Sequence, residues 1–305
     1  MKPWPWPKAS QGLYRQTRAM LDASAGLSIT GWEVSCKFSP RGLETGRWLL
    51  GFSPVGVAAK RLHELPHRLG MPSGAAADFG LRLASSSQVL LAVEQGAQQT
   101  VSKAYLEFPV NQRAATPLHL IGYKWPIPQT ACADSAPPAR LTHYRWPGDH
   151  DQARSLLMQA AGREAGGLTQ ASACALLAQA LQWTQGQKPG QRPALLLAVS
   201  EAGSPRASWT AKFYDSPLRA ADLRSGVTRL AAAWGLSDGD VQAVLDVIGS
   251  REIGWLAAGT GSEGLPFFTL YAAADRDDAH QALSACTEVP RHALHRTSWV
   301  AGAST

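Results

Sequence analysis

Glu33-Val34-Ser35-Cys36-Lys37 is a charged stretch that nevertheless has the pattern of a β-strand. Side chains alternate between the two faces of a strand, so Glu33, Ser35 and Lys37 share one face. A turn-like segment at 39–42 and a second strand at 46–52 follow it. Sheets ordinarily bury apolar groups on the core face. The charged face therefore either meets solvent or lines a polar cavity, and the function depends on which.

Size and composition predict a folded protein with a sizeable core. The chain has 305 residues, of which 45% are hydrophobic and 17% charged. We expect a single domain over residues 1–305. The net charge of +6 comes from scattered basic residues, without a Lys/Arg run. That distribution disfavours nucleic acid as a partner, but it fits a bound phosphate or diphosphate, which uses only a handful of basic residues.

The cysteines and the hydropathy pattern indicate a reduced, soluble protein. Cys36, Cys132, Cys174 and Cys286 lie far apart and form no CxxC pair, so neither a zinc site nor a redox motif is expected. The first residues have no apolar core of signal-peptide length. No run reaches the ~18 apolar residues of a membrane helix. We therefore expect a cytoplasmic, monomeric protein without a membrane partner.

Strand patterns occur in pairs, with helical patterns between the pairs. Short turns within most pairs make them antiparallel hairpins. About ten strands covered by helices on one face can close into a barrel, which removes exposed edges. We therefore expect an α+β fold, a ten-stranded antiparallel barrel surrounded by helices, with a lumen wide enough for a ligand. The predicted strands are 30–38, 46–53, 88–94, 103–110, 118–125, 141–146, 194–201, 208–215, 252–258 and 265–273. The predicted helices are 10–24, 55–69, 150–162, 168–184, 217–234, 238–249 and 275–286.

Every predicted hairpin carries polar or aromatic groups at period-two spacing. If these groups face inward, they form a cationic patch rimmed by aromatic rings. Several buried cations need a counter-anion, and a diphosphate would supply it. The alternative is that these groups face solvent while the other set packs under the helices. The five hairpins contribute Glu33, Lys37 and Arg47; Lys103, Tyr105 and Glu107; Lys124, Arg145 and either His143 or Tyr144; Lys212 and Tyr214; and Thr269 and Tyr271.

These motifs resemble those of the ABBA (PT-barrel) aromatic prenyltransferases. Within that family the chain looks most like the cyanobactin branch, which prenylates ribosomally made peptides. The strand that ends in Lys37 is similar to the family's Glu-x-Ser-Cys-Lys strand, and Arg47 precedes an apolar run as the family's arginine does. The chain departs from the pattern at Glu107 and Thr269, where basic groups are expected, and by a Pro/Ala-rich loop at 126–138. Further similar positions are Lys103, Leu120-Ile121-Gly122-Tyr123, Gly259-Thr260 and Leu270-Tyr271.

The resemblance implies an activity: transfer of a dimethylallyl or geranyl group from an allylic diphosphate to a nucleophilic side chain, such as Tyr or Trp, of a modified or cyclic peptide. Glu33 would orient the acceptor and take its proton. Leu196 would lie where the length of the donor is set, and its intermediate size leaves both donors open. The implied diphosphate-binding residues are Lys37, Arg47, Lys103, Lys124 and Lys212. The implied cation-shielding residues are Tyr105, Tyr144, Tyr214 and Tyr271.

By the same resemblance, Mg²⁺ would accompany the diphosphate. The chain has no DDxxD box, so the diphosphate rather than the protein would hold the metal. Asp275, Asp277 and Asp278 are better explained as acids at the start of a helix. Two alternatives to a peptide prenyltransferase remain open: an enzyme that prenylates a small aromatic natural product, and a non-catalytic ligand-binding barrel.

Overall fold

The computed structural model describes Trp4 and residues 11–96, 99–109, 118–127, 138–162, 170–185 and 194–286. Most of the predicted 126–138 loop, with Cys132, lies outside these residues. The described strands are β1 (Ile29–Ser39), β2 (Gly42–Glu44), β3 (Arg47–Phe52), β4 (Gln88–Gln95), β5 (Thr100–Glu107), β6 (Leu118–Pro126), β7 (Arg140–Arg145), β8 (Leu195–Glu201), β9 (Ala207–Lys212), β10 (Ile253–Thr260) and β11 (Pro266–Ala273).

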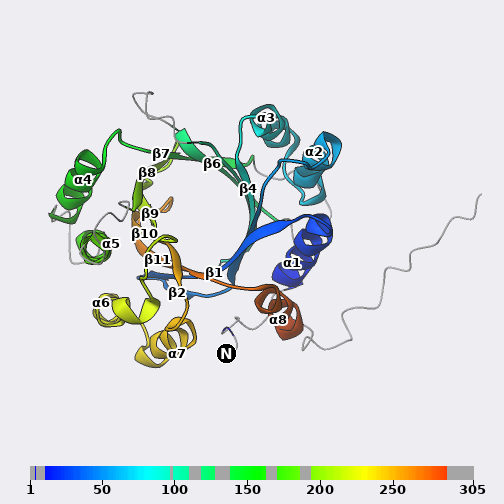
Figure 1. Ribbon diagram of the computed structural model, residues 1–305. Helices are drawn as coiled ribbons and strands as arrows, with labels where there is room; N and C mark the ends of the chain where they lie inside the picture. The colour runs from blue at the N-terminus through cyan, green and yellow to red at the C-terminus, as the bar shows by residue number, and fades with distance from the viewer. Residues whose placement is uncertain are drawn as a thin grey trace, which may run out of the picture.

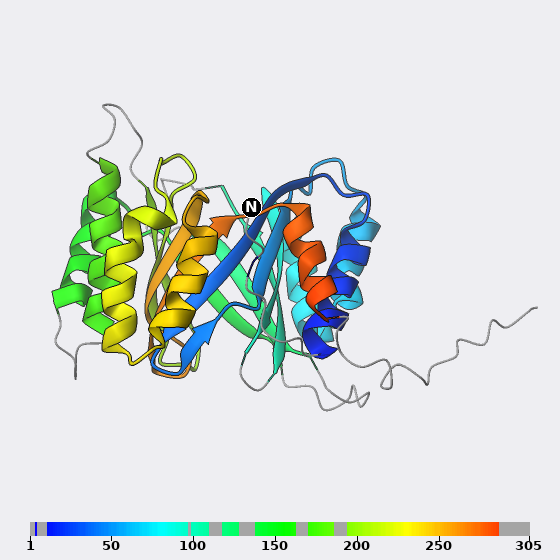
Figure 2. The same ribbon diagram turned by 90° about the horizontal axis from the view of Figure 1, so that it is seen from below.

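The strands form a closed antiparallel barrel, as predicted. Consecutive strands pair from β3 to β11, β1 pairs with β3, and β1 also pairs with β11, which closes the ring. Ten strands make the barrel, and β2 is a short addition that pairs with β1 beside the turn at 39–42. Figure 1 shows the ring of strands with the helices outside it, and Figure 2 shows the barrel from the side. Closure leaves no long strand edge exposed.

Eight helices lie outside the barrel in the described part of the chain (Figure 1). The helix α3 was not predicted, because Gly74 and Gly80 lower the helix propensity of its sequence. Gly80 lets the His63 side chain of α2 lie close to α3, since a Cβ there would lie 2.8 Å from Nδ1 of His63. The helices are α1 (Gln11–Ser24), α2 (Ala59–Arg68), α3 (Ser73–Leu83), α4 (His150–Gly162), α5 (Gln170–Gln185), α6 (Ala220–Ala233), α7 (Asp238–Ile248) and α8 (Arg276–Cys286).

The two faces of the barrel differ in chemistry. In β1, Val34, Cys36 and Phe38 face the helices and belong to the hydrophobic core. The alternate residues of the strand face inward. Lys212 of β9 contacts Glu107 of β5 at 3.3 Å, and these strands are not neighbours in the sheet. Such a contact is possible only across the interior, so the polar face lines the lumen rather than meeting solvent.

The hairpin geometry gives the barrel two distinct ends. The turn between β1 and β2, the turn between β10 and β11, and the β4–β5 and β8–β9 connections lie at one end, which we call the turn end. The longer connections that contain the helices lie at the other, which we call the helix end. The distance of an inward-facing residue from its hairpin turn therefore sets its depth in the lumen. No helix among the described residues is long and apolar enough to cross a membrane.

Candidate active site

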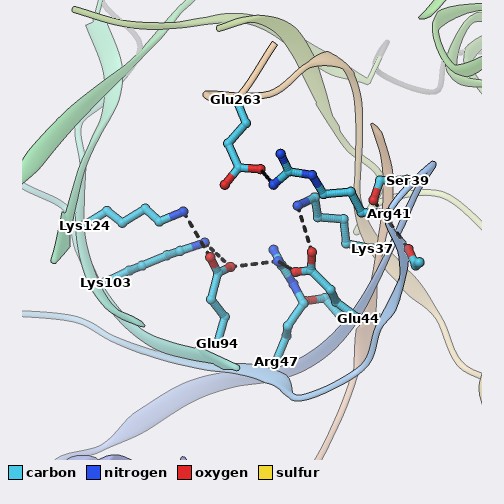
Figure 3. Close-up of polar contacts among 11 residues, drawn as sticks. Lys37, Ser39, Arg41, Glu44, Arg47, Glu94, Lys103, Lys124 and Glu263 are labelled. Atoms are coloured by element: carbon cyan, nitrogen blue, oxygen red, sulfur yellow. Dashed lines mark hydrogen bonds and ion pairs between the residues drawn. The ribbon is translucent and has the colours of Figure 1, made fainter. Parts of the chain in front are cut away.

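Three cations from neighbouring strands converge on one carboxylate near the turn end. Arg47 Nη1 lies 2.7 Å from Glu94 Oε2, Lys103 Nζ lies 2.5 Å from the same oxygen, and Lys124 Nζ lies 3.1 Å from Oε1 (Figure 3). The strand register produces this cluster, because Arg47 is directly opposite Glu94 and Lys103 is directly opposite Lys124. Two lysines facing each other would repel, so the carboxylate between them stabilises the arrangement.

A second carboxylate extends the cluster toward β1. Glu44 accepts a hydrogen bond from Lys37 Nζ at 3.0 Å and lies 3.4 Å from Arg47 Nη1 (Figure 3). Arg47 also donates from Nε to Ser35 Oγ at 3.1 Å, which fixes the plane of its guanidinium. Four cations and two carboxylates therefore form one network, which we call the cationic cluster: Lys37, Arg47, Lys103, Lys124, Glu44 and Glu94.

Burial and charge act against each other in the cationic cluster. Burial raises the pKa of Glu94, but Arg47, Lys103 and Lys124 outweigh it and hold that pKa well below its usual value. Burial lowers the pKa of Lys103 to about 7, with Arg47 and Lys124 lowering it further and Glu94 opposing them. Burial also lowers the pKa of Arg47, but Glu94 and other nearby groups raise it above its ordinary value. Glu94 is thus the internal anion that favours the charged forms of Arg47 and Lys103.

Tyrosine rings lie beside the cationic cluster in the lumen. Tyr105 is two residues from Lys103 on the same face of β5, and its ring meets that of Tyr144 edge-on at 6.2 Å. Gly122 makes room for this pair, because a Cβ there would lie 2.7 Å from Cε1 of Tyr105. Tyr271 of β11 lies directly opposite Ser35, the residue whose hydroxyl accepts a hydrogen bond from Arg47. Burial raises the pKa of Tyr105, and it raises the pKa of Tyr144 to about 12, so both rings are neutral phenols.

Glu33 lies deeper, toward the helix end, and its surroundings differ from the cationic cluster. The carboxyl group is buried, with 3% of the residue exposed, and it accepts a hydrogen bond from the Tyr214 hydroxyl. Burial raises the pKa of Glu33 to about 8; Lys212 lowers it and Glu107 raises it. A carboxyl group poised near neutral pH can act as a general base or acid.

Lys212 is part of the surroundings of Glu33 at the helix end. Its Nζ pairs with Glu107 and lies 5.4 Å from the centre of the Trp255 ring. His119 Nε2 lies 3.5 Å from the same Glu107 oxygen. Burial raises the pKa of Glu107, but His119 and Lys212 together bring it below its ordinary value. Glu107, which breaks the expected basic pattern, therefore serves as the counter-ion of Lys212.

The structure brings most of the predicted site residues together. Lys37, Arg47, Lys103 and Lys124 form the cationic cluster, and Tyr105, Tyr144 and Tyr271 lie in the lumen beside it. Tyr144, rather than His143, faces inward. Thr269, opposite Lys37, is buried on the inward face of β11.

Three predicted residues lie elsewhere. Lys212 and Tyr214 lie beside Glu33, because they are at and beyond the end of β9, far from its hairpin turn. Leu196 faces outward and packs in the core under the helices, which gives no support for a role in donor length. Leu195 and Leu197, on the other face of β8, point into the lumen instead.

Two residues of the site, Glu44 and Glu94, were not among the functional residues predicted from the sequence. Glu94 ends a predicted strand, and it has the same parity as the inward-facing Ala92 and Leu90. Its position directly across from Arg47 in the next strand is the signal that could have identified it.

The acidic residues at the start of α8 have a structural role. Asp275 and Asp278 cap the helix reciprocally: each backbone N–H donates to the other's carboxylate, at 3.1 and 3.0 Å. Asp278 also forms a buried two-bond ion pair with Arg251, at 2.7 and 2.8 Å. Among the described residues, no group of three His, Cys, Asp or Glu side chains could hold a metal ion.

No protein-family model and no curated protein sequence matches the chain. Solved structures with a similar fold include 5-dimethylallyltryptophan synthase from Streptomyces coelicolor, with 13% identity over 92% of this chain and 99% of that one and a TM-score of 0.49. AnaPT from Neosartorya fischeri is 12% identical over 79% and 77% of the two chains, with a TM-score of 0.47. NotF prenyltransferase is 11% identical over 79% and 80%, with a TM-score of 0.44. These similarities concern the fold.

Proposed function

We propose that the protein transfers a prenyl group from an allylic diphosphate to an aromatic acceptor inside the barrel. The observation that carries the proposal is the convergence of Arg47, Lys103 and Lys124 on a single buried anionic position in the lumen. A diphosphate carries more negative charge than the Glu94 carboxylate and can take its place. Arginine and lysine donors arranged in this way also stabilise the charge that develops on a leaving diphosphate.

The charge balance of the cationic cluster supports a divalent metal as companion of the donor. Four cations against two carboxylates leave an excess positive charge that a diphosphate more than neutralises. Mg²⁺ typically binds substrate phosphates together with one or two carboxylates. Glu44 and Glu94 are the carboxylates of the cationic cluster, although each already forms an ion pair with Lys or Arg. The diphosphate would therefore be the main ligand of Mg²⁺, which would neutralise charge on the leaving group.

The chemistry follows from the order of groups along the lumen. The C–O bond of the donor breaks, the diphosphate keeps the electron pair, and an allyl cation remains. Tyr105, Tyr144 and Tyr271 surround this cation with aromatic faces, each worth about 0.5–2 kcal/mol. The acceptor attacks the cation, and Glu33 takes the proton that the acceptor loses. Depth in the barrel thus separates the leaving group from the base.

The acceptor enters, in this proposal, at the Glu33 end. Tyr214, which contacts Glu33, is 41% exposed, so this end of the lumen communicates with solvent. An acceptor side chain of a peptide could reach Glu33 from outside without the whole peptide entering. We therefore propose a Tyr- or Trp-containing peptide, modified or cyclic, as the first acceptor to test, and a small aromatic molecule as the second. Dimethylallyl and geranyl diphosphate are the donors of choice.

The test is a transfer assay with mass spectrometry. Wild-type protein is incubated with either donor, Mg²⁺, and two acceptor sets: linear and cyclic peptides with Tyr or Trp, and free indoles, phenols and naphthalenes. We expect a mass gain of one prenyl unit, lost in Arg47→Met and retained in the exposed control Glu64→Gln. Donor binding without transfer to any acceptor would favour the ligand-binding barrel, and absence of binding would overturn the proposal.

A further inference from the structure

Tyr214 connects the most buried ionisable group of the helix end to the surface. Glu33 is 3% exposed, whereas Tyr214 is 41% exposed, and the Tyr214 hydroxyl donates a hydrogen bond to Glu33 Oε1. Among the described residues, it is the side chain whose hydrogen bond reaches the Glu33 carboxyl group. Tyr214 lies two residues beyond the end of β9, at the helix end, opposite to the cationic cluster. It therefore lies at the other end of the lumen from Arg47.

The backbone of β10 is shaped around this contact. The register of β10 against β11 shifts between Ile253 and Trp255, which leaves Gly254 in an irregular position. A Cβ on Gly254 would lie 2.5 Å from Glu33 Oε1 and 2.5 Å from Cζ of Tyr214. The Gly254 carbonyl accepts the backbone N–H of Phe213 at 2.8 Å, which anchors the segment that carries Tyr214. Glycine at 254 thus makes the contact between the two side chains sterically possible.

We propose that the Tyr214 hydroxyl carries the proton from Glu33 to solvent after each prenyl transfer. This inference rests on the proposed function, in which Glu33 receives the acceptor's proton. Once Glu33 is protonated, its O–H donates to the Tyr214 oxygen, so the hydrogen bond of the resting pair reverses and the Tyr214 O–H turns toward solvent. The Glu33 O–H bond then breaks as its proton passes to the Tyr214 oxygen, while the Tyr214 O–H proton passes to water or buffer. Glu33 returns to the carboxylate and Tyr214 stays a neutral phenol, so protons and electrons balance.

The other charged groups near Glu33 are occupied and do not provide this path. Lys212 of β9 pairs with Glu107 of β5 and lies over Trp255. Both influence the charge of Glu33, since Lys212 favours the carboxylate and Glu107 opposes it. Because burial favours the protonated form of Glu33, the reset to carboxylate is the step that needs a connection to water.

The experiment separates the first turnover from later ones in the full-length protein. Tyr214→Phe keeps the ring and removes the hydroxyl; Gly254→Ala keeps both side chains and pushes them apart. Tyr123→Phe is the matched control, because Tyr123 also donates to a carboxylate, Asp78, but outside the lumen. Rapid-quench assays give the first-turnover rate, and steady-state assays give the later turnovers. Imidazole is added as an external proton carrier.

We expect the first turnover of Tyr214→Phe to stay within about twofold of wild type, while the steady-state rate falls about tenfold or more, so that a burst appears. Imidazole should restore the steady state in Tyr214→Phe, and Gly254→Ala should show the same burst. Steady-state rates within about twofold of wild type, an equal fall of both phases without rescue, or a faster variant would each overturn the relay. If wild type transfers no prenyl group, the proposed function fails with it; if wild type is active and Tyr214→Phe matches it, only the relay fails.

Discussion

Glu94→Gln tests whether Glu94 is the anion that organises the cationic cluster. The substitution keeps the shape of the side chain and removes its charge, so Arg47, Lys103 and Lys124 lose their shared counter-ion. Removing one partner of a buried ion pair costs about 3–5 kcal/mol, because a buried charge stays uncompensated. Lys103 can relieve part of this cost by releasing a proton, since its pKa is already lowered to about 7. We therefore expect a less stable free protein.

The expected change is measurable by thermal unfolding. In large domains one kcal/mol corresponds to about 2 °C, so the melting temperature should fall by about 6–10 °C. Inorganic diphosphate should raise the melting temperature of Glu94→Gln more than that of wild type. In the variant it supplies the missing negative charge, whereas in wild type it must first displace Glu94.

Calorimetry or intrinsic tryptophan fluorescence, with and without diphosphate, makes the measurement. Glu64→Gln is the control, because Glu64 forms an exposed pair with Lys60 at 3.9 Å. Such pairs contribute only about 0.3–0.5 kcal/mol. An unchanged melting temperature of Glu94→Gln, or an equal stabilisation of both proteins by diphosphate, would refute the role assigned to Glu94.

Three further predictions concern other parts of the molecule. Glu33→Gln should be more stable than wild type above about pH 5, because the pKa of Glu33 is raised to about 8 in the folded protein, whereas the unfolded chain releases this proton above about 4.5. In urea unfolding, the difference in stability between variant and wild type should grow to roughly 4–5 kcal/mol by pH 8, and a difference that stays constant with pH would contradict the prediction. Gly122→Ala should displace Tyr105 and reduce the rate of prenyl transfer about tenfold or more, while diphosphate binding, measured by calorimetry, stays within about twofold of wild type. An equal loss of transfer and of diphosphate binding would argue against a role of Tyr105 that is limited to stabilising the cation. Asp278→Asn should destabilise the protein by about 3–5 kcal/mol by leaving Arg251 buried without its partner, and a denaturation midpoint like that of wild type would exclude this.

The barrel could be predicted from the sequence because its strands come in pairs with strict alternation. The charged face of 33–37 identified the lumen, since five hairpins with polar residues of one parity have few other ways to bury them. Helix α3 was missed because its two glycines lower local helix propensity, although one of them, Gly80, lies in close contact with His63 of α2. The predicted helix at 55–69 contains Pro66, and α2 nevertheless continues to Arg68, because Pro66 lies in the last turn of the helix, where one lost hydrogen bond is tolerated.

Parity alone could not assign depth within the lumen. Lys103 follows its hairpin turn closely, whereas Lys212 ends its strand, so the two lysines serve different ends of the barrel. Leu196 has the opposite parity from the inward residues of β8, which its apolar character could not reveal. Counting residues from each turn would have separated Lys212 and Tyr214 from the cationic cluster.

A crystal structure with Mg²⁺ and an unreactive thiolodiphosphate analogue of the donor tests the central claim most directly. We predict that the diphosphate contacts Arg47, Lys103 and Lys124, that Glu94 no longer lies between these three side chains, and that the prenyl chain extends past Tyr105 toward Glu33. A diphosphate bound beside Lys212, or outside the barrel, would contradict the account.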